Sequence, residues 1–459
     1  MLPVVALLGR PNVGKSTLFN RLTRTRDALV ADLPGLTRDR QYGYGVLGPV
    51  PYIVVDTGGL TDARVGVEAL AAGQSLRALD EADAVILVCD AQAGLTHADR
   101  AVAERLRAKG KRILLAANKA EGMDAGSAVA DFHALGFGEP QAISALHGDG
   151  LAVLMDEALA GFEAEPPPPE MDQEVRVAIV GRPNVGKSTL VNRLLGEERV
   201  VASELPGTTR DSIAVPFARG DRRYVLIDTA GIRRRARIEE EVEHDSVVRT
   251  LRAIDGSNVV VAVLDAREGV TEHDSALLGI AVERGRALVI ALNKWDGLTQ
   301  DQRDQAHRSM DLRLPFVAYA AVHQISALHG TGVGELLRAV DRCWAAATRE
   351  LQTTELTKVL ERALVQHQPP LVRGRRIKLR YAHQGGRNPP VIVIHGNQTE
   401  DVPGAYRRYL ENVYREAFDL HGTPVRIEFR TGRNPFKGRR NPLTARQVKS
   451  RQRLKRHGR

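Results

Sequence analysis

Short apolar runs alternate with longer polar segments from the N-terminus to about residue 348. The polar segments have the spacing of amphipathic helices, and each apolar run is long enough for one buried strand. This alternation predicts two regions built on parallel α/β sheets. The predicted strands cover residues 2–8, 52–55, 85–88, 113–116, 224–227, 259–264 and 288–292.

The pattern changes after residue 348, where the segments follow the order αββαβ. The predicted helices cover 356–366 and 405–420, and the strands cover 377–382, 391–395 and 425–429. This order predicts a third, smaller α+β domain.

Four consecutive prolines in an acidic setting predict an extended spacer before the second region. The predicted parts are 1–165 and 175–348 as α/β domains, 166–174 as linker, 349–430 as the α+β domain and 431–459 as tail.

An internal repeat relates the two α/β regions. The sequence GRPNVGKST of residues 9–17 recurs unchanged at residues 181–189, an offset of 172 residues. The same offset relates two further motifs, and after small insertions an Asn-Lys pair and a Ser-Ala-Leu-His-Gly run also recur. A repeat in register across several motifs indicates that one domain was duplicated. The further motifs lie at 34–39 and 206–211, 56–59 and 228–231, 118–119 and 293–294, and 144–148 and 326–330.

The repeated sequence is a phosphate-binding loop of the form G-x-x-x-x-G-K-[ST]. In both copies it follows a predicted strand and opens a helix, which is the context that this motif requires. The glycines allow backbone amides to surround phosphates, the lysine bridges the β- and γ-phosphates, and the serine hydroxyl binds Mg²⁺. A chance glycine turn is the alternative, and two copies argue against it. The residues concerned are Gly9, Gly14, Lys15, Ser16, Thr17, Gly181, Gly186, Lys187, Ser188 and Thr189.

A D-x-x-G motif follows a strand in each half. Its aspartate is placed to hold the hydration shell of Mg²⁺, and the amide of its glycine to contact the γ-phosphate. A threonine between loop and strand is expected to complete the metal coordination and to take part in catalysis. An ordinary turn residue is the alternative for each threonine. These residues are Asp56, Gly59, Thr37, Asp228, Gly231 and Thr209.

Base selection is predicted from Asn-Lys-x-Asp, which is intact as Asn293, Lys294 and Asp296. A carboxylate accepts both hydrogens of the guanine N1/N2 edge, which adenine cannot offer. The amides of Ala145 and Ala327, which follow Ser144 and Ser326, are expected to donate to guanine O6. Together with the loops, this predicts an α/β fold with two tandem P-loop NTPase domains of the Ras-like G type that use GTP.

The first copy reads Asn118, Lys119, Ala120 and Glu121, so its carboxylate stands on a side chain longer by one methylene. We expect this site still to select guanine, with a changed affinity or off-rate, and the alternative is a site that binds no nucleotide. Leu60 and Ile232 stand where a Ras-type enzyme has its water-orienting glutamine.

The loop asparagines Asn12 and Asn184 are candidates to hold K⁺ against the phosphates. The positive charge of such a cation would act where an arginine finger acts in other GTPases. A role in stabilising the loop is the alternative.

Charge is concentrated at the C-terminus. Twelve Lys or Arg and no acidic residue follow Glu428, and subtracting these from the formal net charge of +9 leaves −3 for residues 1–428. Such a block favours a polyanion such as RNA, and a solubilising extension is the alternative. The chain has two cysteines, no leader pattern at residues 2–8 and no apolar stretch of about 18 to 20 residues. These features predict a cytoplasmic protein without a membrane span.

The order of these motifs resembles the Der (EngA) family of bacterial GTPases over nearly the whole chain. The resemblance implies a role in maturation of the large ribosomal subunit, a ribosomal RNA partner and a KH-like third domain. Glu121 departs from the motif, and the third domain has no G-x-x-G turn between its helices, so its RNA contact should be unconventional. The alternatives are a GTPase that gates tRNA modification and an RNA-binding scaffold whose nucleotide is structural.

Overall fold

The computed structural model describes residues 2–23, 41–57, 79–108, 110–163, 174–197, 214–220, 222–227, 247–371 and 376–431. The chain divides into two compact units. The first comprises Met1–Arg349 with Gly386–Pro390 and Phe418–Val425, and the second comprises Glu350–Gly385, Val391–Ala417 and Arg426–Arg459.

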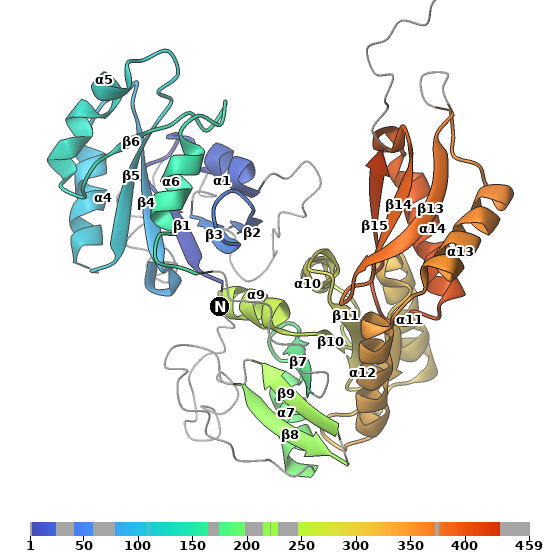
Figure 1. Cartoon of the computed structure of the whole chain (residues 1–459). Coiled ribbons are helices and arrows are strands. Elements are labelled where there is room, and N and C mark those ends of the chain that lie inside the picture. The colour runs from blue at the N-terminus through green and yellow to red at the C-terminus, as the bar shows by residue number, and fades with distance from the viewer. Residues whose placement is uncertain are drawn as a thin grey trace, which may run out of the picture. The chain divides into compact units, whose positions relative to one another are not determined.

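The described part of the first repeat forms a sheet of six strands in the order β2-β3-β1-β4-β5-β6 (Figure 1). Strand β1 lies between β3 and β4 and pairs with both in parallel. The strands are β1 (Val4–Leu8), β2 (Gln41–Gly45), β3 (Tyr52–Asp56), β4 (Ala84–Asp90), β5 (Arg112–Asn118) and β6 (Gln141–Ala142). The helices are α1 (Lys15–Thr23), α4 (His97–Arg107), α5 (Ala125–Val129) and α6 (Leu151–Ala158), with the 3-10 helix η1 (Ala130–Leu135).

The described part of the second repeat has the same strand order, β8-β9-β7-β10-β11-β12. The strands are β7 (Glu174–Val180), β8 (Val215–Arg219), β9 (Arg222–Ile227), β10 (Val259–Asp265), β11 (Ala287–Asn293) and β12 (Ala321–Gln324). The helices are α7 (Lys187–Glu197), α9 (Val247–Gly256), α10 (Glu272–Glu283), α11 (Gln300–Arg313) and α12 (Val333–Thr348), with the 3-10 helix η3 (Pro315–Val317). The duplication seen in the motifs therefore extends to the topology.

The apolar runs form the central strands, as predicted. Every residue of β1, β4, β10 and β11 is buried. Parallel strands covered on both faces need continuous apolar sequence, and each fully buried Val, Leu or Ile contributes about 1.5–3 kcal/mol. Cys89 and Cys343 are both buried, and burial raises the pKa of each thiol to about 12.

The sheets are not purely parallel, since β2 pairs antiparallel with β3, and β8 pairs antiparallel with β9. These edge strands were not predicted. Strand β2 reads QYGYG, which has no apolar run, and Gly45 lies opposite Tyr52. A Cβ on Gly45 would collide with the Tyr52 ring, so the glycine is needed for close packing rather than for a turn.

The C-terminal elements follow the predicted order αββαβ. They are α13 (Thr353–Gln366), β13 (Lys378–Gly386), β14 (Val391–Asn397), the 3-10 helix η4 (Thr399–Asp401), α14 (Gly404–Ala417) and β15 (Arg426–Thr431). The strand order is β13-β14-β15, and β14 pairs in parallel with β15. The buried Tyr414 of α14 donates to the carbonyl of Leu356, 3.2 Å away. Helix α14 ends three residues before the predicted limit, and Asp419 just beyond it has a φ of +52°.

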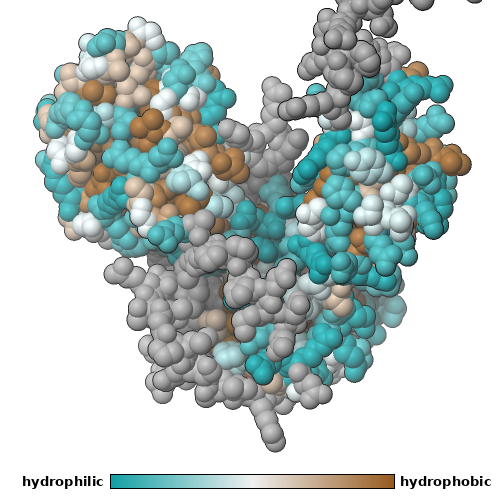
Figure 2. Space-filling view, viewed as in Figure 1, coloured by the Kyte–Doolittle hydropathy of each residue, from teal (hydrophilic) through white to brown (hydrophobic). Residues whose placement is uncertain are grey.

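Figure 2 shows hydrophilic residues over much of the described surface in this view, with apolar residues in scattered patches. Such scattered patches are normal for a globular surface. Within the part of the chain that the structure describes, no helix combines the length and apolar character needed to cross a membrane.

Candidate nucleotide-binding sites

Each phosphate-binding loop connects the carboxyl end of a central strand to the first turn of a helix. Strand β1 ends at Leu8 and α1 begins at Lys15, while β7 ends at Val180 and α7 begins at Lys187. Ligands of open α/β sheets bind at this edge, and a helix N-terminus offers free amides and a favourable dipole to anions.

Glycine is required where the loop enters the helix. Gly14 has a φ of +94° and Gly186 a φ of +99°. A Cβ at either position would collide with an asparagine side chain amide, that of Asn118 in the first copy and Asn293 in the second. The loop backbone therefore packs directly on the asparagine of the motif that is predicted to select the base.

The loop lysines curl back over the backbone. Lys15 Nζ donates to the carbonyls of Gly9 and Arg10 at 2.9 and 2.8 Å. Lys187 Nζ donates to the carbonyls of Gly181 and Arg182 at 2.9 and 2.7 Å. Burial lowers the pKa of Lys15, with Asp56 raising it and Arg10 lowering it further. An ammonium that is buried and donates to backbone carbonyls, as that of Lys15 does, is suited to bind an anionic phosphate.

The first site has oxygen donors suited to Mg²⁺. Asp56 ends β3, is 1% exposed and lies opposite Leu7 in the parallel register with β1. Ser16 is exposed in the first turn of α1. Carboxylate and hydroxyl oxygens are the ligands that Mg²⁺ prefers, so the donor set fits this ion. The remaining predicted contacts to the metal and the γ-phosphate lie outside the described residues. They are Thr37, Gly59, Thr209, Asp228 and Gly231.

Other metal sites have no support within the described ranges. There, no group of three or more His, Cys, Asp or Glu side chains is placed to hold a metal ion.

The two asparagines of the base motif join the phosphate loop to the Ser-Ala-Leu segment. Asn118 Nδ2 donates to the carbonyl of Val13 at 2.7 Å, and its Oδ1 accepts from the amide of Ala145 at 2.8 Å. Asn293 makes the same contacts in the second copy, 2.7 Å to Val185 and 2.9 Å from Ala327. The two predicted donors to guanine O6 thus donate to asparagine here, and their contact with the base stays a prediction.

The lysines of the base motif pair with aspartates that we did not predict. Lys119 lies 2.7 Å from Asp90, at the end of β4, and Lys294 lies 2.6 Å from Asp265, at the end of β10. Burial opposes the charged form of Asp90, but the hydrogen bond from Lys119 and nearby amides hold the pKa of its carboxyl below the ordinary value. The signal in the sequence was an acidic residue closing an apolar run at the same place in both halves.

Glu121 has the same hydrogen-bonding surroundings as its counterpart Asp296. Its own backbone amide and the Ser144 hydroxyl lower the pKa of the Glu121 carboxyl. The Ser326 hydroxyl and its own amide lower the pKa of Asp296. Glu121 Oε2 is buried and has no hydrogen-bond partner among the described residues, so this oxygen is available to a ligand.

Comparisons with known proteins agree with this geometry. The sequence model of a family described as 50S ribosome-binding GTPase matches residues 4–119 and 176–294. The model of the KH-domain-like of EngA bacterial GTPase enzymes, C-terminal, matches residues 350–430.

Relatives named GTPase Der align with the whole chain. Those of Thioalkalivibrio sulfidiphilus, Hahella chejuensis and Methylococcus capsulatus are 59%, 57% and 57% identical to it. The alignments cover 100% of this chain and 99%, 97% and 99% of these relatives. With two G-type sheets, two phosphate loops and a KH-like C-terminal domain, the chain is a GTPase and belongs to the Der (EngA) family.

Proposed function

We propose that this GTPase is a nucleotide-controlled switch in the maturation of the large ribosomal subunit, acting in the cytoplasm on ribosomal RNA. The observation that carries the proposal is the match of both halves to a family described as 50S ribosome-binding GTPase. The twelve basic residues after Glu428 support an RNA contact by the tail. A switch of this kind must bind the particle with different affinities in its GTP and GDP forms.

Both sites are proposed to bind GTP through matching residues, in G domains at 1–165 and 175–348. The linker is 166–174, the KH-like domain is 349–430 and the tail is 431–459. The proposed contacts in the first site are Gly9, Asn12, Gly14, Lys15, Ser16, Thr17, Asp56, Gly59, Asn118, Lys119, Glu121, Ser144 and Ala145. Those in the second are Gly181, Asn184, Gly186, Lys187, Ser188, Thr189, Asp228, Gly231, Asn293, Lys294, Asp296, Ser326 and Ala327.

Hydrolysis of GTP to GDP and phosphate depends on positioning and on charge stabilisation. Lys15 and Lys187 would exchange the loop carbonyls for β- and γ-phosphate oxygens, while the loop amides hold the same phosphates. Mg²⁺, when bound, supplies positive charge at these oxygens. Its proposed ligands are Ser16, Asp56 and Thr37 in the first site and Ser188, Asp228 and Thr209 in the second.

Co-sedimentation of the full-length chain with purified large ribosomal subunits tests the proposal. The binding is measured with GTP, GDP and a non-hydrolysable GTP analogue. We expect the analogue to raise binding above the GDP level, because only a ligand with different affinity for two states moves the equilibrium between them. Equal binding with all three nucleotides, or no binding, would refute the switch.

A further inference from the structure

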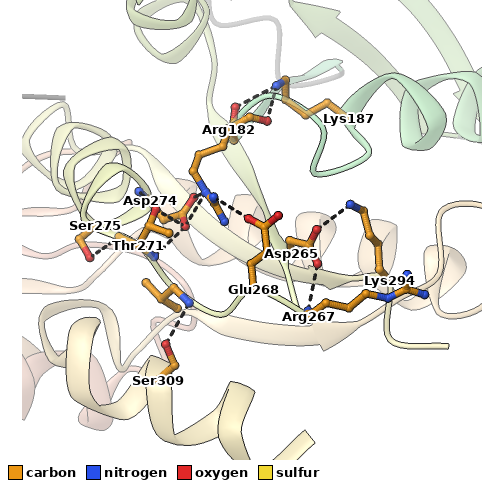
Figure 3. Close-up of polar contacts among 12 residues, drawn as sticks. Arg182, Lys187, Asp265, Arg267, Glu268, Thr271, Asp274, Ser275, Lys294 and Ser309 are labelled. Carbon is orange, nitrogen blue, oxygen red and sulfur yellow. Dashed lines mark hydrogen bonds and ion pairs between the residues drawn. The ribbon is translucent and has the colours of Figure 1, made fainter. Parts of the chain in front are cut away.

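The arginine of the second phosphate loop is held by two carboxylates that lie outside the loop. Arg182 follows the first glycine of the loop, and its Nε lies 3.1 and 3.0 Å from the two carboxylate oxygens of Asp274 (Figure 3). Its Nη1 lies 2.8 Å from Oε2 of Glu268. The Asp274 side chain is fully buried, and that of Arg182 is 17% exposed. This is a charge-assisted contact of the kind that fixes geometry well.

The two carboxylates that hold Arg182 are themselves positioned by α10 and by the turn that precedes it. Asp274 is the third residue of α10 and forms a capping box with Thr271, accepting from its amide at 2.9 Å. Glu268 lies in the turn between β10 and α10. The carbonyl of Arg182 accepts the hydrogen bond of Lys187 (Figure 3). The residue that positions the loop lysine is therefore the same residue that is tied to α10.

The first site has no counterpart of the contact between Arg182 and Glu268. Its equivalent Arg10 lies 3.5 Å from Asp99 and 4.0 Å from Asp90, ion pairs that are too long or misaligned for hydrogen bonds. Ala93 occupies the position that corresponds to Glu268. Arg10 Nε and Nη2 are buried and have no hydrogen-bond partner within the described ranges. Two loops of identical sequence thus differ in how their arginine is held, and one difference outside the loops is Ala93 in place of Glu268.

We propose that Glu268 is a positioning residue that, with Asp274, holds the second phosphate loop through Arg182, so that this site releases guanine nucleotide more slowly than the first. The inference rests on the nucleotide sites proposed above. A loop fixed in its binding conformation loses less freedom when it holds a ligand, which favours slow dissociation. The Glu268 side chain is 61% exposed, so its ion pair is weak, and we expect about a two- to fivefold effect on release.

The test follows release of a fluorescent GDP from the full-length chain with one site silenced. Lys15→Ala leaves the second site loaded, and Lys187→Ala leaves the first. Adding Glu268→Ala is expected to speed release about two- to fivefold in the Lys15→Ala chain only. Glu335→Ala is the matched control, because Glu335 is 56% exposed, pairs with Arg338 and lies outside both sites.

A gain of function separates positioning from a general effect on folding. Ala93→Glu is expected to slow release of GDP from the first site. Glu268→Gln keeps a hydrogen bond without the charge, so its release rate from the second site is expected to lie between those of the parent chain and Glu268→Ala. Added salt should bring the second site toward the Glu268→Ala rate, since a half-exposed ion pair is screened.

The inference is overturned if Glu268→Ala leaves release unchanged or if Ala93→Glu has no effect. If Lys15→Ala and Lys187→Ala each fail to remove nucleotide from one site, the nucleotide sites themselves are wrong, and the asymmetry falls with them.

Discussion

Asn118 and Asn293 account for much of the geometry of the two sites. Each is buried, donates to a carbonyl of the phosphate loop and accepts from the amide of the following Ser-Ala-Leu segment. Both polar ends of the side chain are satisfied, which rigidifies a buried group. The glycine that approaches each asparagine leaves space for it. Each asparagine therefore links the phosphate loop to the segment that is predicted to contact the base.

Guanine selection by the first site is predicted to depend on the carboxylate of Glu121. We expect Glu121→Ala, in a Lys187→Ala chain, to weaken GDP binding about 10- to 100-fold, because a hydrogen bond to a charged group contributes about 1.5–3 kcal/mol. Glu121→Asp should bind GDP within a few-fold of the parent chain. Isothermal titration calorimetry measures the affinity of both variants for GDP and for ADP. GDP affinity unaffected by Glu121→Ala would show that this carboxylate does not read the base.

Asn12 and Asn184 lead to a prediction about monovalent cations. Both side chains are exposed, and their φ angles are +66° and +65°, so the two loops present them alike. If they hold K⁺ against the phosphates, GTP turnover should be about tenfold or more faster in K⁺ than in Na⁺, and Asn12→Ala with Asn184→Ala should abolish the difference. Asn412→Ala, on the exposed face of α14, is the control. Equal phosphate release in both salts would exclude the cation role.

The strands and helices show which parts of the fold are encoded locally. Continuous apolar runs predicted the central parallel strands, because burial on both faces leaves no other sequence. The edge strands β2, β6, β8 and β12 were missed, since edge strands need no such run and β2 contains two glycines. The phosphate loops were predicted from the spacing of the motif, its place between a strand and a helix, and its occurrence in two copies. The partners Asp90, Asp265 and Asp274 were not, because they lie far along the chain from the residues they hold.

The basic tail gives a prediction at the scale of one segment. Deletion of residues 432–459 removes eleven of the twelve positive charges that follow Glu428. We expect weaker binding to ribosomal RNA and a shallower dependence of affinity on salt, by about 0.7–0.9 in the logarithmic slope for each phosphate that the tail no longer neutralises. Filter binding over a range of salt concentrations measures both quantities. A truncated chain with the same affinity and slope would refute RNA binding by the tail.

The whole molecule repeats one G-type design in two copies that are not equivalent. Both have the same strand order, the same loop and the same asparagine contacts. They differ at the carboxylate of the base motif and at the anchor of the loop arginine, where Glu268 corresponds to Ala93. If Glu268 slows release as inferred above, these differences would give one chain a slowly released nucleotide and a more readily exchanged one.

Each copy is proposed to bind GTP through its own loop lysine. Nucleotide content and GTP turnover of the full-length chain should be measured for Lys15→Ala, Lys187→Ala and the double variant. We expect each single variant to lose one site and the double variant to lose both, since each lysine supplies a charged hydrogen bond to the phosphates, about a 10- to 100-fold effect per site. Undiminished GTP uptake and turnover in the double variant would show that the loop lysines do not hold the nucleotide.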